Sequence, residues 1–389
     1  MNRRRHVLIA DATLLAIEEI STAHRVLGRL EPVVVDGQSD GPAFARGVQQ
    51  LIVQERVSVV FGCWTSASRK TVKPVFEQHN HLLLCPVQYE GLEQSPNTVY
   101  TGAAPNQQIV PAVKWCLDRL GRRFFLVASD HVFPRAANEV IRDQVTALRG
   151  EIVGEEYIPL GSHEVGRAVR AIVAQQPDVI LNTINGDTHV AFFAALRQAG
   201  ITPERIPTMS FSIAEDELRT LGCQRMVGDY ACWNHFQSID TPENRRYVAG
   251  FQARHGPDRS TDDPLEAAYF GGELWAQAAT EAGTDEVGAV RAALPDQSLL
   301  APEGLVHVDA DSNRTWKTVR IGRIRADGQF TIVWSSQTAI RPVPHPSYRS
   351  QSDWDAFLRG LHEGWGRQWA APATRGRGGA GTSPEGAPL

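Results

Sequence analysis

No run of about twenty consecutive apolar residues occurs in this sequence, and a helix that crosses a bilayer needs one. A secretory signal peptide is not predicted either, because the apolar stretch from Val7 to Ala10 ends at Asp11. That stretch is shorter than the roughly seven apolar residues that such a signal contains. We therefore expect no membrane insertion, and a cytoplasmic location if translation begins at Met1.

Cysteine is scarce, and its five copies are odd in number and scattered. Most of them lie inside apolar runs typical of strands, which favours buried thiols over a set of disulfides. No zinc-ligand spacing occurs, and no two histidines form a His-x-x-x-His pair with a nearby carboxylate, so no metal site is predicted. A formal net charge of -5 also provides no attraction to nucleic acid.

The motifs of several enzyme classes are missing. The sequence has no Gly-x-Ser-x-Gly nucleophile turn, no phosphate-binding Walker loop and no Gly-x-Gly-x-x-Gly dinucleotide fingerprint after a strand. No residue stands out as a nucleophile or a base. We therefore predict that the protein is not an enzyme and needs no cofactor, and a hydrolase on the same fold is the weakest alternative.

The most informative local pattern lies between residues 59 and 70. An apolar, β-branched run ends at Gly62, and hydroxyl residues then open a helical pattern. This order predicts a parallel strand that leads into a helix N-terminus, which is where open α/β sheets bind ligands. The unpaired amides of the first helical turn favour an oxygen of the ligand. Ser66 adds a hydroxyl and Trp64 a flat apolar wall, although Thr65 or Ser66 could instead serve only as the helix cap.

Units of a strand followed by a helix repeat along the chain and start afresh near residue 121. Strands are expected at 30–35, 59–61, 81–85, 124–128, 151–159, 179–183, 207–211 and 228–236, and helices at 11–20, 44–55, 109–120, 168–175, 191–199 and 264–279. Alternating patterns at 305–308, 315–324 and 330–334 predict antiparallel strands late in the chain. The predicted fold class is α/β, with two doubly wound parallel-sheet lobes joined by a hinge.

A chain of 389 residues is too long for a single core, so it is divided into lobes. Residues 1–120 and about 237–300 are assigned to the first lobe, residues 121–236 and about 301–346 to the second, and residues 347–372 to a C-terminal extension. Residues 373–389 are rich in Gly and Pro and cannot bury enough apolar surface, so a disordered tail is expected there.

Several motifs in the strand-end loops resemble one known family. They are Gly-Cys-Trp-Thr-Ser-Ala-Ser-Arg-Lys at 62–70, Pro-Val-Gln-Tyr-Glu-Gly at 86–91, Ala-Pro-Asn-Gln-Gln at 104–108, Ser-Asp-His-Val-Phe-Pro-Arg at 129–135 and Asn-Gly-Asp at 185–187. From about Asp11 to Pro346 the chain resembles the urea- and short-amide-binding branch of type I periplasmic binding proteins. That branch includes the receptor subunit of urea ABC importers and an amide-sensing negative regulator of an amidase operon.

The resemblance implies that a ligand binds between the lobes. The implied ligand-binding residues are Trp64, Ser66, Gln88, Tyr89 and Glu90 from the first lobe, and His131, Phe133, Asn185 and Asp187 from the second. The carbonyl of a flat urea or amide would take hydrogen bonds from the Ser66 hydroxyl, and its NH2 groups would donate to side-chain oxygens. Tyr89 and Phe133 could instead be ordinary core aromatics, and Asp187 could be only a helix cap.

Two departures from the family pattern stand out. His131 occupies a position where the family usually has Tyr, and Cys85 occupies one where the sensing regulators have Tyr. Both changes alter the hydrogen bonding expected in the pocket. His131 could also make ligand binding pH-dependent. The family's first strand, which normally precedes the helix that begins at Asp11, has no counterpart unless Arg5 to Ile9 fills its place.

The function implied by the resemblance is a solute-binding receptor that delivers urea or a short aliphatic amide to an ABC permease. Such a receptor is periplasmic or lies at the cell surface. The alternative is a cytoplasmic amide sensor that acts through a regulatory partner protein, and the segment from Ser350 to Arg359 resembles the tail of that sensor. Either role is compatible with a homo-oligomer, and neither involves direct contact with nucleic acid.

Overall fold

Three short parallel strands form the centre of the first lobe in the computed structural model, which describes residues 3–23, 28–38 and 40–372. These strands are β1 (Val60–Phe61), β2 (Leu83–Cys85) and β3 (Thr98–Tyr100), and the helices around them are α1 (Arg3–Thr22), α2 (Gly41–Val53), α3 (Ser66–Gln78), α9 (Pro242–His255), α10 (Asp263–Ala282) and α11 (Val287–Ala293). One apolar cluster joins α1, α9 and α10 to β2, and another joins α2 and α3 to β1 and β2. The sheet is therefore covered on both faces, as parallel sheets require.

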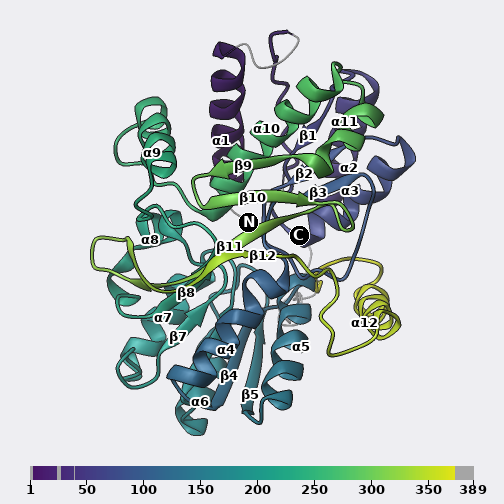
Figure 1. Cartoon of the computed structure of the whole chain (residues 1–389). Helices are drawn as coiled ribbons and strands as arrows, with labels where there is room; N and C mark the ends of the chain where they lie inside the picture. The colour runs from purple at the N-terminus through teal and green to yellow at the C-terminus, as the bar shows by residue number, and fades with distance from the viewer. Residues whose placement is uncertain (1–2, 24–27, 39, 373–389) are drawn as a thin grey trace, which may run out of the picture.

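The second lobe repeats this arrangement with longer strands. Its strands β4 (Arg123–Ser129), β5 (Glu151–Ile158), β6 (Val179–Thr183), β7 (Thr208–Ser210) and β8 (Tyr230–Trp233) are all parallel. Helices α4 (Ile109–Arg119) and α5 (Val132–Ala147) pack on one face, and α6 (Gly166–Gln175), α7 (Thr188–Gln198) and α8 (Glu215–Leu221) on the other. Figure 1 shows the two lobes one above the other, with α1 and α10 in the upper lobe and α4 to α7 in the lower.

Strand β11 (Arg314–Ile324) links the lobes. Its first residue pairs with Tyr100 of β3, and Arg320 pairs with Trp233 of β8, so one sheet runs β1-β2-β3-β11-β8-β7-β6-β4-β5. The late strands β9 (Ser298–Ala301), β10 (Gly304–Asp309) and β12 (Phe330–Ile340) pair antiparallel, which confirms the predicted α/β class with added antiparallel strands. Strands β9 and β10 pack on α10, hence beside the first lobe, whereas the proposed division assigned 301–346 to the second.

The predicted strand at 30–35 is wrong. Those residues are not in helix or strand and pair with no other strand of the described chain. They line a cavity of about 680 Å³ whose other wall includes β1, and among the strands that the structure describes β1 pairs only with β2. The helix predicted from Asp11 begins instead at Arg3, so residues 5–9 extend α1 and do not supply a strand beside β1.

Three further expectations can be compared with the structure. All five cysteines are free thiols, as predicted, although Cys223 is only half-buried. Within the described ranges, no helix combines the length and the apolarity needed to cross a bilayer. The C-terminal extension contains helix α12 (Gln351–Gly364), and the tail predicted at 373–389 lies outside the described residues.

Candidate functional site

A cavity of about 180 Å³ lies between the two lobes. The loops that follow β1 and β2 form its first-lobe wall, and those that follow β4, β5, β6 and β7 form its second-lobe wall, with Trp233 at the end of β8. The start of α10 closes one side through Asp262 and Pro264. Nearly every lining segment is thus the carboxyl end of a parallel strand, the position at which α/β sheets collect ligands.

Seven of the nine residues predicted from the sequence line this cavity. They are Trp64, Ser66, Gln88, His131, Phe133, Asn185 and Asp187. The structure therefore brings together residues separated by more than one hundred positions in the chain. Phe133 also belongs to the apolar core beneath α5, so it packs and lines the cavity at once. Asp187 makes no capping hydrogen bond with α7, which leaves the helix-cap interpretation unsupported.

Tyr89 and Glu90 do not line the cavity, which corrects the sequence prediction. Tyr89 is buried, its ring stacks on Tyr100 with centroids 4.7 Å apart, and the Arg69 guanidinium lies 4.6 Å from its centroid. Glu90 has no exposed surface and forms an ion pair with Arg69 at 2.9 Å. After Gln88 the loop turns inward because two buried cations on α3, Arg69 and Lys70, require anionic partners.

Helix α3 begins where the sequence predicted, and Thr65 is its cap. The Ser68 amide donates to Thr65 Oγ1 at 3.1 Å, and the Thr65 amide donates to Ser68 Oγ at 3.2 Å, so the two residues form a capping box. Two residues before Thr65, Cys63 has a φ of 69°, a left-handed conformation that is unusual for a residue with a Cβ. Because Thr65 caps the helix, the Ser66 side chain is available for another role.

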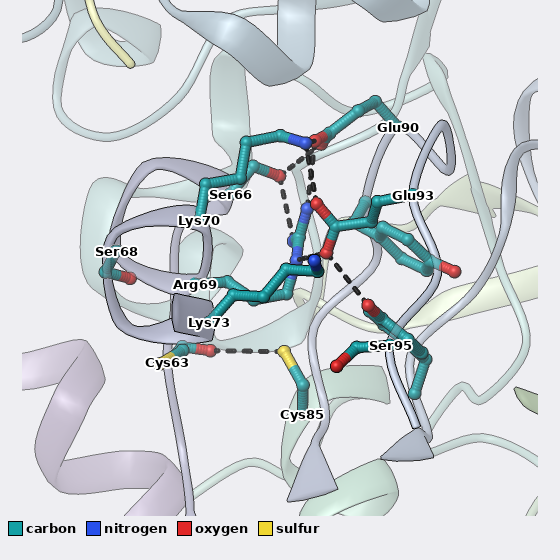
Figure 2. A network of polar contacts seen from close by, with 12 residues as sticks. Cys63, Ser66, Ser68, Arg69, Lys70, Lys73, Cys85, Glu90, Glu93 and Ser95 are labelled. Atoms are coloured by element: carbon teal, nitrogen blue, oxygen red, sulfur yellow. Dashed lines mark hydrogen bonds and ion pairs between the residues drawn. The ribbon is translucent and has the colours of Figure 1, made fainter. Parts of the chain in front are cut away.

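The Ser66 hydroxyl belongs to a buried ionic network, which Figure 2 shows from close by. It donates to Glu90 Oε2 and accepts from Arg69 Nη1 at 3.1 Å. Lys70 Nζ lies 2.6 Å from Glu93 Oε2 and 3.2 Å from Glu90 Oε1. Burial alone would raise the pKa of Glu93, but the Arg69 and Lys70 charges outweigh it and hold that pKa well below its usual range. Since its proton is donated to Glu90, Ser66 can act toward a ligand in the cavity only as an acceptor.

The Gln88 side chain reaches from the first lobe to the second. Its Nε2 donates to the carbonyl of Phe211 at 3.1 Å, and that carbonyl follows β7. Its Oε1 is buried and has no hydrogen-bond partner among the described residues. A buried carbonyl without a donor costs about 1–3 kcal/mol, so this atom is a candidate acceptor for a ligand N–H group.

The side chains of His131 and Asn185 are held together on the second-lobe wall. His131 Nε2 lies 2.8 Å from Asn185 Oδ1, and Asn185 Nδ2 donates to Ser212 Oγ at 2.9 Å. This arrangement assigns the proton of neutral His131 to Nε2, because Asn185 Oδ1 can only accept. Burial lowers the pKa of His131 from its usual value, although the bond to Asn185 and the charges of Glu90 and Asp130 oppose that effect. His131 is therefore neutral at pH 7, with Nδ1 as an acceptor.

Sequence reasoning missed two carboxylates that line the cavity, Glu217 and Asp262. Glu217 Oε2 accepts from the Ala214 amide at 2.8 Å, and Asp262 caps α10 by accepting from the Leu265 amide at 3.1 Å. Burial, with Glu217 and Asp216 nearby, raises the pKa of Asp262 well above its usual range. Glu217 and Ser212 follow the predicted strand at 207–211, so the tendency of ligands to bind at the carboxyl ends of strands could have identified them. Asp262 had no such signal.

Comparison with known proteins places the chain in a family. Residues 5–351 match the family described as "Periplasmic binding protein domain". A Brucella melitensis protein described as "Leu/Ile/Val-binding protein homolog 6" is 21% identical over 302 residues, which are 76% of this chain and 77% of that protein. A "Limonene hydroxylase" of Geobacillus stearothermophilus is 31% identical over 124 residues, but these are only 32% of this chain and 23% of the hydroxylase.

Solved structures share the fold at low sequence identity. A solute-binding protein of an R. palustris ABC transporter, in complex with 4-hydroxybenzoate, has a TM-score of 0.77 and 20% identity, covering 85% of this chain and 93% of that one. An amino acid ABC transporter substrate-binding protein of Pseudomonas fluorescens Pf-5 has a TM-score of 0.76 and 22% identity, covering 88% and 94%. With its two lobes, its interlobe cavity and a match over most of its length, this chain belongs to the periplasmic binding protein domain family.

Proposed function

We propose that this protein is a solute-binding receptor that holds urea or a short aliphatic amide between its lobes and delivers it to an ABC importer. The observation that carries the proposal is the hydrogen-bonding character of the cavity. Ser66 Oγ, Gln88 Oε1 and His131 Nδ1 all offer lone pairs, and the carboxylates of Asp187 and Glu217 add more. A ligand that satisfies them must carry several N–H donors.

Urea and short amides meet this requirement. Their NH2 groups can donate to the buried oxygens. The Ser66 and Ala67 amides, in the first turn of α3, have no partner within the helix and could donate to the ligand carbonyl. The rings of Trp64, Phe133 and Trp233 provide flat apolar surface for a planar solute. A solute lacking one of these partners would lose on the order of 1–3 kcal/mol of binding free energy.

The charge and size of the cavity argue against other ligand classes. Among the cavity-lining residues that the structure describes, Asp187, Glu217 and Asp262 are acidic and none is Lys or Arg, so an anion such as a benzoate would find no cationic partner there. A volume of about 180 Å³ is also small beside the roughly 300–1,000 Å³ of pockets for drug-sized ligands. Both features favour a small, uncharged or weakly basic solute.

Calorimetric titration of the purified chain tests the proposal. Urea, acetamide, leucine and 4-hydroxybenzoate are titrated separately at pH 7.5. We expect heat of binding from urea or acetamide and none from 4-hydroxybenzoate, because no Lys or Arg among the described cavity-lining residues would pair with its carboxylate. Binding of leucine or 4-hydroxybenzoate alone would overturn the assignment of ligand class and leave the cavity as the site of a different solute.

A second candidate function is the amide sensor that regulates amidase expression through a partner protein. The observation that favours it is helix α12, an ordered addition at the C-terminal end that follows the two-lobed body. The two roles differ in their partner. Affinity capture from the source organism separates them, since a permease complex supports the importer and a cytoplasmic regulator supports the sensor.

A further inference from the structure

The C-terminal strap, defined here as residues 349–371, is anchored on the second lobe. Arg349 forms ion pairs with Glu139 and Asp143 of α5 at 2.5 and 2.6 Å. Trp354 of α12 is fully buried and donates from Nε1 to the carbonyl of Pro346 at 3.0 Å. Leu358 joins it in the apolar cluster beneath α5. Figure 1 shows α12 beside α5 at the edge of the lower lobe.

Beyond α12 the strap turns back toward the cavity. Gly366 and Arg367 have φ values of 65° and 62°, and two consecutive left-handed residues reverse the chain. The next residues form an antiparallel bridge in which Ala370 lies opposite His131. In it the Val132 amide donates to the carbonyl of Trp369 at 3.1 Å, and the Ala371 amide donates to the carbonyl of Asp130 at 3.2 Å. The backbone on both sides of His131 is therefore bonded to the strap.

The same strap also contacts α3 of the first lobe, whose first residue, Ser66, lines the opposite wall of the cavity. The Lys70 ammonium, on α3 of the first lobe, lies 5.0 Å from the ring centroid of Trp369, within the range of a cation–π contact. Lys70 in turn pairs with Glu90, and Glu90 accepts the Ser66 hydroxyl. Trp369 thus stands between two chains of contacts, one that ends at His131 and one that ends at Ser66.

We propose that Trp369 is a positioning residue that couples the two walls of the ligand cavity, and that the strap restrains the opening of the lobes. The choice of ligand in the test rests on the proposed function, whereas the coupling itself does not. Covering α5 would need only Trp354 and Leu358, which already fill that role. Residues 369–371 contact the cavity loop and the other lobe, and an opening of the lobes would break the contact between Trp369 and Lys70.

The matched variants are Trp369→Leu and Trp365→Leu. Both tryptophans are half-buried on the same strap and pack against the same apolar cluster, but among the described contacts only Trp369 reaches Lys70 and the His131 loop. Leucine keeps apolar bulk and removes the ring. Trp369→Phe restores a ring over Lys70 and is the rescue variant.

Three measurements are made on each full-length variant: amide exchange at Val132, lobe separation by small-angle scattering, and urea titration. For Trp369→Leu we expect exchange at Val132 to quicken about tenfold, the scattering radius to increase and urea affinity to fall about tenfold, the scale of one lost buried contact. Trp365→Leu and Trp369→Phe should resemble the parent protein. Equal exchange and equal lobe separation in Trp369→Leu and Trp365→Leu would overturn the coupling. If the parent protein binds no urea but amide exchange and lobe separation still differ between Trp369→Leu and Trp365→Leu, the proposed ligand is wrong and the coupling through Trp369 is supported.

Discussion

The hydroxyl of Ser66 donates its hydrogen bond to the carboxylate of Glu90, which is fully buried behind the cavity wall. Because Arg69 also donates to the same hydroxyl oxygen, Ser66 meets a ligand as an acceptor. The sequence-based hypothesis had given Ser66 the opposite task, as a donor to the ligand carbonyl. The buried Glu90 therefore sets the polarity of one cavity residue without touching the cavity itself.

Replacing Ser66 or Trp64 with alanine should weaken urea binding about tenfold in each case, the scale of one lost buried partner. The fold should persist, because Glu90 keeps its ion pairs with Arg69 and Lys70. Isothermal titration measures the affinity and thermal unfolding checks the fold. Ser58→Ala is the control, since its hydroxyl bonds Asp285 outside this cavity. Unchanged affinity in both variants would remove Ser66 and Trp64 from the site.

Glu90→Gln should be costly for stability. It leaves Arg69 and Lys70 buried with one carboxylate fewer, and removal of one partner from a buried ion pair typically costs about 3–5 kcal/mol. Unfolding should be followed in guanidinium chloride, because urea is the proposed ligand. Asp118→Asn, which breaks a half-exposed pair with Lys114, should cost less than about 1 kcal/mol. Equal losses of unfolding free energy in Glu90→Gln and Asp118→Asn would contradict a special role for the buried ionic network.

Gln88→Met should separate binding from stability. The variant removes the unpartnered Oε1, so urea affinity should fall about tenfold. Stability should change little, because Gln108 Nε2 also donates to the Phe211 carbonyl, at 3.3 Å, and keeps it satisfied. Isothermal titration and thermal unfolding on the same preparation measure the urea affinity and the stability. A loss of stability without a loss of affinity would show that Gln88 serves the lobe contact alone.

The pH dependence of stability should reveal Glu215. Burial, with Glu217 and Asp263 nearby, raises its pKa from 4.5 to about 8 in the folded chain. The unfolded chain therefore releases this proton first as pH rises from 4.5, and stability falls by about 1.4 kcal/mol per pH unit until pH 8. Glu215→Gln does not lose stability in this way, so the free energy of unfolding of the variant, relative to that of the parent protein, should increase between pH 5 and pH 8. A constant difference in unfolding free energy between the two proteins across that pH range would contradict the raised pKa of Glu215.

Sequence patterns predicted most of the strands and helices because their signals are local. The second-lobe strand at 179–183 begins with the apolar run Val179 to Leu181 and is followed by turn residues, and the structure places β6 at the same residues. The failure at 30–35 has the opposite cause. Its residues suit a strand, but a strand needs a paired neighbour, and the described chain provides none at that edge of the sheet.

Seven of the nine predicted residues line one cavity because parallel strands end at one edge of a sheet, so a strand-end rule selects neighbours in space. Tyr89 and Glu90 passed the same rule and lie elsewhere. Whether a loop side chain faces inward or outward depends on what is buried behind it, here Arg69 and Lys70 on α3. No periodicity in the sequence encodes that contact.

The α/β class and the loops that carry the polar residues could be predicted from the sequence, since both follow from periodicity and turn residues along the chain. Only the folded chain shows that Asp262 and Glu217 line the same cavity as His131, that Ser66 acts as an acceptor, and that Trp369 lies over Lys70. The physical reason is that hydrogen-bond direction and charge balance are set by partners distant in sequence, and they are fixed only when burial forces each polar group to find one.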